Sequence, residues 1–343
     1  MAEIIGLGEY GIRMICDQII PAGTGDDTKA RFAAASLSRY LSANTNPEAK
    51  TLWEKICLGY AASGEDYGVK DFFIRQLQLT GSSEAVFALK DYLMSRELCN
   101  PALAVIRSVG GLGAEEILAE ALKNPGLPCA AGVMNALALM RSPLAVNEYI
   151  RFASDINVNT RASAFNALAQ SGSPLAYPVL HDAAKDVGYR WEHTGATASL
   201  LEYARNAGLA GDLKTMDRIC NLVMAKCNDK TTIQNKSAAL KIYTGFHGTG
   251  AMKVLFKAAG HPDKTYREAA FQASLLVPGK EIINKWLDFY PKAESFARPG
   301  IIYMLGSFGD ELSLPLVRQA MNDADPEVRA AAVTAVSKIS GNK

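Results

Sequence analysis

The apolar residues of this chain recur at the spacing of one helix face, and the pattern returns at a fixed interval. Near the C-terminus, Ala332, Val333 and Val336 lie three, four and seven positions after Arg329. This spacing places all three on one side of an α-helix. Other basic residues are followed by apolar residues at the first two of these offsets. The basic residues of this series, which we call the basic anchors, lie 31 positions apart at Lys236, Arg267, Arg298 and Arg329.

The first half of the chain keeps the same interval. The equivalent positions, again 31 residues apart, are Cys99, Ala130 and Arg161. Looser members of the series are Arg31, Lys70 and His193. Each unit also has a second, shorter apolar segment before its anchor helix, and the alternating pattern of hairpin strands is missing. The pattern therefore predicts an all-α solenoid of about ten helical hairpins, in which stacking buries the apolar faces.

Several of these units resemble a known repeat family. Residues 325–339, with the preceding 310–322, resemble short HEAT-like repeats of the type found in phycobilisome lyases, and the Ser-Pro-Leu-Ala openings at Ser142 and Ser173 are similar. The resemblance extends over nearly the whole chain, although Cys99 and Ala130 replace the basic anchor in two units. It implies an armadillo-type, right-handed α–α superhelix, with residues 1–343 as a single solenoid, and it implies no activity.

A narrower resemblance concerns the N-terminal segments 7–11 and 25–31. They resemble the repeat region that precedes the 3-keto-disaccharide hydrolase domain in exported bacterial proteins. No part of that catalytic domain is present in the sequence. The resemblance implies that the chain is an accessory region of a larger exported, carbohydrate-active protein, which would place it in the periplasm or outside the cell.

The 31-residue interval breaks between His193 and Lys236, which are 43 residues apart. We therefore expect regular blocks at about 70–193 and 231–343, joined by an irregular junction at about 186–230. The junction begins with residues that are unusual in an Ala-rich repeat, namely Tyr189, Arg190, Trp191 and His193. In one interpretation, Trp191 fills a seam between repeats. In the other, these residues anchor a ligand or peptide, because exposed Trp, Tyr and Arg side chains frequently dominate binding energy.

The basic anchors also have two interpretations. Acidic residues lie four positions before three of them, at Asp263, Glu294 and Asp325. This order favours ion pairs within a helix. In the structural interpretation, the anchors staple adjacent units together. In the alternative, they form a row of cations that binds an acidic partner.

The charge of the chain is balanced overall but not locally. The 36 basic and 35 acidic residues give a net charge of +1, which disfavours a dedicated nucleic-acid-binding protein. Residues 213–262, however, contain eight basic and two acidic side chains. This excess predicts either solvated helix faces or a patch for an acidic partner or a phosphate group.

The reactive residue types show no catalytic or metal-binding spacing. The six cysteines are scattered without a Cys-x-x-Cys pair, and the four histidines lack the spacing of metal ligands. Buried free thiols are typical of a reducing compartment, which favours the cytoplasm, although an even number of cysteines is compatible with disulfides. We therefore expect no cofactor, no metal and no enzymatic activity.

These observations favour a non-enzymatic interaction scaffold that binds a protein or peptide on the concave face of the solenoid. One alternative is the accessory region implied by the narrower resemblance. Another is an enzyme similar to DNA glycosylases on a HEAT fold, whose basic face would bind nucleic acid. No apolar run approaches the roughly 18 residues that a membrane-spanning helix needs, so we expect no membrane span.

Overall fold

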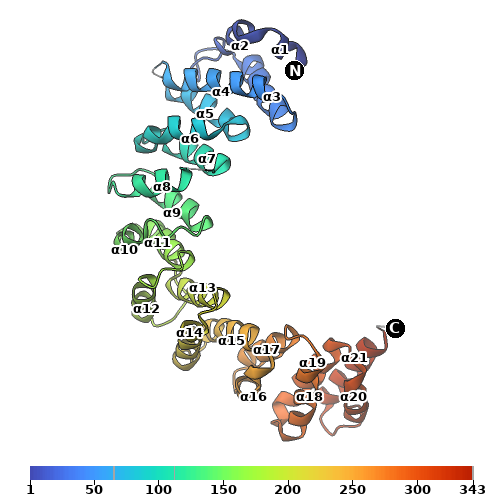
Figure 1. Cartoon of the computed structure of the whole chain (residues 1–343). Helices are drawn as coiled ribbons and strands as arrows, with labels where there is room; N and C mark the ends of the chain where they lie inside the picture. The colour runs from blue at the N-terminus through green and yellow to red at the C-terminus, as the bar shows by residue number, and fades with distance from the viewer. Residues whose placement is uncertain (65, 112, 342–343) are drawn as a thin grey trace. The chain divides into compact units, whose positions relative to one another are not determined.

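The computed structural model describes residues 1–64, 66–111 and 113–341, and its regular structure within these ranges is helical throughout. The chain divides into two compact units, Met1–Ser173 (unit 1) and Pro174–Lys343 (unit 2). Figure 1 traces their helices in chain order from blue to red. The predicted all-α fold class is confirmed. The last two residues of the predicted block 231–343 lie outside the described residues. Among the described helices, none combines the length and the apolar character needed to cross a membrane.

Unit 1 consists of helices that pack in pairs, α4 on α5, α6 on α7, α8 on α9 and α10 on α11. In addition, α3, α5, α7, α9 and α11 pack on one another in chain order and form one layer, whereas α4, α6 and α8 form a second layer. The helix bounds are α1 Ala2–Gly6, α2 Gly8–Cys16, α3 Thr28–Ala43, α4 Pro47–Ala62, α5 Tyr67–Thr80, α6 Ser83–Leu89, η1 Lys90–Met94, α7 Cys99–Val109, α8 Ala114–Leu122, α9 Ala130–Leu139, α10 Val146–Phe152 and α11 Val158–Gln170.

Unit 2 repeats this two-layer arrangement. Its first layer is α13, α15, α17, α19 and α21, of which the last four lie side by side in Figure 1, and α16, α18 and α20 lie in its second layer. The helix bounds are α12 Ala176–Asp186, α13 Ala196–Leu209, α14 Leu213–Lys226, α15 Ile233–His247, η2 Gly248–Ala251, α16 Met252–Ala259, α17 Lys264–Leu275, α18 Lys280–Phe289, η3 Tyr290–Lys292, η4 Ser295–Ala297, α19 Arg298–Phe308, η5 Glu311–Ser313, α20 Leu314–Ala320 and α21 Pro326–Gly341.

Except for His193, which lies in the loop before α13, the anchor positions fall in the first turn of the first-layer helices, and the apolar residues after them form the core. In α19, for example, Ile301 and Ile302 are fully buried. The residue four positions after an anchor packs on the next helix of the layer, where Phe271 of α17 leaves no room for a side chain on Gly300 of α19. The prediction is wrong for Val333, which is 56% exposed. The reason is that α21 is the last helix within residues 113–341, so no described helix covers this face of it.

Each unit contains a fully buried tryptophan whose indole binds a serine of the neighbouring helix. In unit 1, Trp53 Nε1 of α4 donates to Ser38 Oγ of α3 at 2.8 Å. In unit 2, Trp286 Nε1 of α18 donates to Ser274 Oγ of α17 at 3.1 Å. Buried indole N–H groups need such a partner. These pairs therefore lock the second layer onto the first through one apolar side chain and one hydrogen bond.

A disulfide links Cys99, the first residue of α7, to Cys129, which immediately precedes α9. The expectation of free thiols is wrong for these two cysteines. Stacked repeats bring equivalent helix starts together, and the two Cα atoms are 6.0 Å apart, within the usual range for a disulfide. The other four cysteines, Cys16, Cys57, Cys220 and Cys227, are free and buried. Burial raises the pKa of Cys16 and of Cys220 to about 12.

Candidate functional site

The anchor arginines bind the backbone of the loop that precedes their own helix. Arg267 Nη1 donates to the carbonyl oxygens of His261 at 2.9 Å and Pro262 at 2.8 Å. Arg298 Nε donates to the carbonyl oxygen of Ala293 at 3.3 Å. Two further arginines repeat the geometry of Arg267, with Arg161 bound to Asp155 and Ile156, and Arg329 bound to Asp323 and Ala324. Each arginine therefore closes its loop against the start of the helix.

The predicted ion pairs between these anchors and the acids four residues earlier are wrong. The Asp263 carboxylate instead accepts a hydrogen bond from the backbone N–H of Tyr266 at 3.2 Å, and Asp325 accepts one from Glu327 at 2.8 Å. Both carboxylates lie at helix starts, where free N–H groups compete for them. None of the three predicted pairs occurs among the ion pairs of the described residues.

Two basic anchors also contact an aromatic ring of the following repeat. Lys236 Nζ lies 4.9 Å from the ring centre of Tyr266. The guanidinium carbon of Arg267 lies 4.8 Å from the ring centre of Phe296. Cation–π contacts of this kind are stabilising, so these two anchors staple adjacent repeats, although by a different interaction from the one expected. These contacts favour a structural role for Arg267.

Replacing Arg267 by methionine is expected to lower the free energy of unfolding by about 1–2 kcal/mol, because two charge-assisted hydrogen bonds and one cation–π contact are lost. The loss stays modest since water reaches the freed carbonyl of exposed Pro262. Urea denaturation followed by circular dichroism measures it. Lys264→Met is the matched control, because Lys264 is an exposed cation on the same helix. Equal effects of the two substitutions would contradict the stapling role.

The loop between α12 and α13 places an aromatic side chain on the surface of unit 2. Trp191 is 74% exposed, and its ring lies edge-on to that of His193 with the centroids 5.1 Å apart. Trp191 therefore does not fill a seam between repeats, as one interpretation expected. Tyr189 occupies the buried position of the loop instead. The surface of the loop is formed by Arg190, Trp191 and His193, all of them exposed.

Hydrogen bonds hold this loop in a fixed place on unit 2. Tyr189 has a φ angle of 57°, and its carbonyl oxygen accepts from Asn235 Nδ2 of α15 at 2.8 Å. The Glu192 carboxylate accepts from the backbone N–H groups of Thr194 at 2.7 Å and Ala196 at 2.9 Å. Partial burial acts to raise the pKa of Glu192, but a hydrogen bond from the Thr194 hydroxyl and those from the backbone N–H groups outweigh it, and the pKa is lowered. Glu192 therefore remains an ionised cap at the start of α13 at neutral pH.

A basic pocket of unit 2 includes Lys236, which follows Asn235 along α15. The pocket has a volume of about 290 Å³ and is lined by residues of α14, α15, α16 and α17 and of the loop before α17. Its basic lining residues are Lys236, Lys253, Lys257 and His261. Burial lowers the pKa of Lys236, and the charge of Lys257 acts in the same direction. Part of the charge excess at 213–262 is thus gathered at one place.

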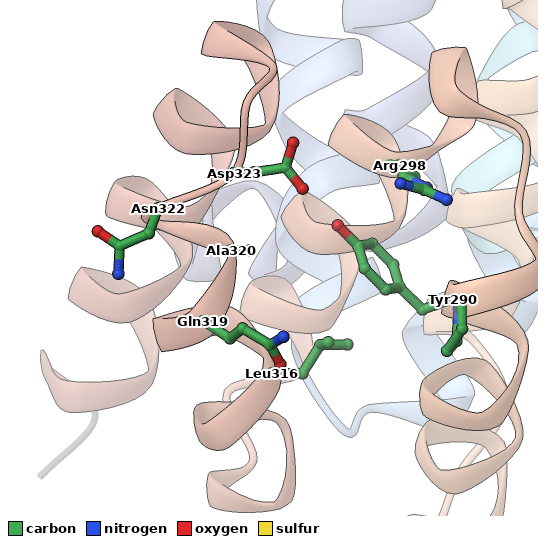
Figure 2. A pocket seen from close by; sticks show the side chains of 8 residues that line it. Tyr290, Arg298, Leu316, Gln319, Ala320, Asn322 and Asp323 are labelled. Atoms are coloured by element: carbon green, nitrogen blue, oxygen red, sulfur yellow. The ribbon is translucent and has the colours of Figure 1, made fainter.

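A second pocket of unit 2, of about 540 Å³, lies where η3, α19 and α20 meet (Figure 2). Tyr290 and Arg298 line one part of it, and Gln319, Asn322 and Asp323 line another. The Tyr290 hydroxyl is buried without a hydrogen-bond partner among the described residues, and Figure 2 shows it pointing toward Asp323. Burial raises the pKa of Tyr290, and the charge of Asp323 does so as well. The hydroxyl is therefore a neutral donor.

The structure adds residues that sequence reasoning missed. The charge count included Lys253 and Lys257 in a basic region, but it could not show that α16 directs them to the pocket of Lys236. No feature of the sequence pattern pointed to Tyr290, because it lies in a 3-10 helix between two repeat helices. Within the described ranges, no group of three or more His, Cys, Asp or Glu side chains is placed to hold a metal ion.

Comparison with known proteins identifies the fold, and it identifies the repeat type of the last repeat alone. The HEAT repeat family matches residues 314–342, and no curated protein matches the chain. Yeast importin-β (Kap95p) is 14% identical over 96% of this chain and 51% of its own, with a TM-score of 0.51. An engineered protein is 15% identical over 96% of this chain and 98% of its own, with a TM-score of 0.42. Human deoxyhypusine hydroxylase is 14% identical over 75% of this chain and 96% of its own, with a TM-score of 0.32.

The chain spans about half the length of the importin-β chain that it matches. At this level of identity the likeness shows the fold alone. It shows an all-α solenoid of helices packed in pairs, and the HEAT match is confined to the last repeat. The fold expected from the 31-residue interval is therefore confirmed.

Proposed function

We propose that this chain is a non-enzymatic scaffold that docks a protein or peptide partner on unit 2 through Arg190, Trp191 and His193. The observation that carries the proposal is the 74% exposure of Trp191 on a loop held by hydrogen bonds. Solenoids of this kind typically bind partners on their extended surfaces. A protein partner would bury the indole. Tryptophan side chains are rarely this exposed in folded proteins.

The fixed loop conformation supports the same proposal energetically. Tryptophan and arginine are enriched among the few residues that supply most of the binding energy of an interface. A side chain on a loop that is already ordered loses little entropy when a partner binds. Tyr189 and Glu192, which hold the loop, therefore act as positioning residues, whereas Arg190, Trp191 and His193 would contact the partner.

Replacing Trp191 by alanine is expected to weaken partner binding by about thirtyfold, the effect of losing a hot-spot side chain worth about 2 kcal/mol. The tagged wild-type chain captures candidate partners from the natural host, and each is then purified and titrated calorimetrically against the wild type and the variant. Phe32→Ala is the matched control, because Phe32 is an exposed aromatic residue of unit 1. A purified partner that binds Trp191→Ala as tightly as the wild type would contradict the proposal.

A second candidate function is the accessory region of an exported carbohydrate-active protein. The Cys99–Cys129 disulfide supports it, because structural disulfides persist mainly in oxidising compartments such as the periplasm. This candidate is compatible with partner docking, since an accessory solenoid can bind a protein next to a catalytic domain. Recovery of the chain from its natural host with both cysteines reduced would contradict it.

A further inference from the structure

The basic pocket of unit 2 gathers positive charge from three lysines. Lys236 comes from α15, Lys253 and Lys257 lie one turn apart on α16, and His261 follows α16. None of the three lysines belongs to an ion pair in the part of the chain that the structure describes. Lysines from two helices therefore line one small volume.

Neutral groups enclose the ammonium group of Lys236. The side chain is 7% exposed, and its Nζ donates to Asn228 Oδ1 at 2.8 Å and lies 4.9 Å from the Tyr266 ring centre. The charge of Asp263 acts on Lys236, but the Asp263 carboxylate also accepts a hydrogen bond from the start of α17. A buried cation loses hydration that neutral partners replace only in part. An anion that enters the pocket would supply the missing interaction.

His261 adds a neutral donor to this pocket. Its Nδ1 accepts a hydrogen bond from the backbone N–H of Asp263 at 3.1 Å, so the proton of the neutral ring resides on Nε2. Burial lowers the pKa of His261, and the neighbouring charge of Lys236 lowers it further. At neutral pH the imidazole therefore offers an N–H group without adding a fourth charge beside the lysines.

The lining of the pocket matches a phosphate monoester better than a carboxylate. A phosphate group presents three acceptor oxygens that point in different directions, and these suit separate ammonium groups from α15 and α16. A carboxylate presents only two oxygens in one plane, whereas lysine ammonium groups bind phosphate as separate point charges. The apolar residues Met224, Val254 and Ala258 also line the pocket. These apolar side chains can contact the organic group of the ester. A volume of about 290 Å³ can hold one phosphate group.

We propose that this pocket binds the phosphate group of a monoester, with Lys236, Lys253 and Lys257 as charged contacts and His261 as a neutral donor. The ester is either a phosphorylated side chain of a protein or a small phosphorylated molecule. The pocket shares no contact residue with the Trp191 docking surface, so either site can exist without the other.

Calorimetric titration of the full chain with phenyl phosphate at low salt tests the proposal. We expect the wild type to bind this probe with a dissociation constant of about 1 mM or lower, and added salt to weaken binding. Lys253→Gln/Lys257→Gln should bind at least about tenfold more weakly. Both lysines are exposed, so the variant should keep its fold, which circular dichroism checks. Lys241→Gln, an exposed lysine of α15 outside the lining, is the matched control and should bind like the wild type.

Two results would overturn the proposal. One is the absence of binding by the folded wild type at about 10 mM phenyl phosphate, and the other is equal affinity of the wild type and the double variant.

A phosphoserine peptide of otherwise uncharged sequence distinguishes a phosphorylated protein from a small phosphorylated molecule. Binding of this peptide at least about tenfold tighter than phenyl phosphate, with no binding of its unphosphorylated form, supports a protein ligand. Equal or weaker binding of the peptide supports a small phosphate ester. The Trp191→Ala variant should bind phenyl phosphate normally, so failure of the docking surface and failure of this pocket are distinguishable.

Discussion

Replacing Trp286 by alanine is expected to lower the free energy of unfolding of unit 2 by about 3–5 kcal/mol. The side chain is fully buried and packs against the rings of Phe256, Phe271 and Phe289, with centroid distances of 5.1, 5.9 and 5.7 Å. Its removal leaves a cavity between α17 and α18 that the rigid repeat can fill only in part. Ser274 keeps a partner, since its hydroxyl also donates to the Ala270 carbonyl. The loss therefore comes from the cavity and the ring contacts.

Peptide-resolved hydrogen exchange measures this effect, because it reports the opening of α17, α18 and α19 separately from the rest of the chain. Trp191→Ala is the matched control, since it removes the same side chain from an exposed position of the same unit. It should change stability by less than about 0.5 kcal/mol. If both substitutions accelerated exchange in α17–α19 equally, the buried tryptophan would not hold the two layers together.

Reduction of the Cys99–Cys129 disulfide is expected to lower the free energy of unfolding of unit 1 by about 3–4 kcal/mol. The bond closes a segment of 30 residues, and constraining a loop of this length in the unfolded chain accounts for a stabilisation of that size. Guanidinium denaturation with and without a reductant, followed by circular dichroism, measures the difference. Intact mass before and after reduction shows whether the bond is present.

The variant with Cys99→Ala and Cys129→Ala is the control for this experiment. The other four cysteines are free, so a reductant should leave the stability of this variant unchanged. A wild-type chain whose stability does not respond to the reductant would contradict a structural disulfide in unit 1.

The periodicity of the sequence predicts the fold because the repeats place apolar residues at the same offsets from their anchors. Residues such as Ile301 and Ile302 stand at fixed offsets from an anchor, and stacking places them in the core. The same reasoning fails for Val333, since burial there requires a following helix and the offset alone does not show whether one exists. The pairing of Cys99 with Cys129 could not be predicted from the offsets either, because only stacking brings residues 30 positions apart into contact.

The candidate site was predicted in part. The unusual composition of residues 186–195 singled out the loop, but it could not show which aromatic residue is buried, and in the structure that residue is Tyr189. The i,i+4 acids suggested ion pairs at the anchors, because spacing within a helix is visible in the sequence. Competition from helix-capping N–H groups and loop carbonyls depends on backbone geometry, which the spacing does not contain. The convergence of Lys236 with Lys253 and Lys257 likewise depends on how α15 and α16 pack.

Hydrogen exchange of the full chain with and without a purified partner shows whether unit 2 docks that partner through Arg190, Trp191 and His193. We expect the partner to slow exchange of the amides in the loop between α12 and α13 and at the start of α13, with little change in α3 around Phe32. Slowed exchange confined to other segments, with the Trp191 loop unaffected, would contradict docking through this loop.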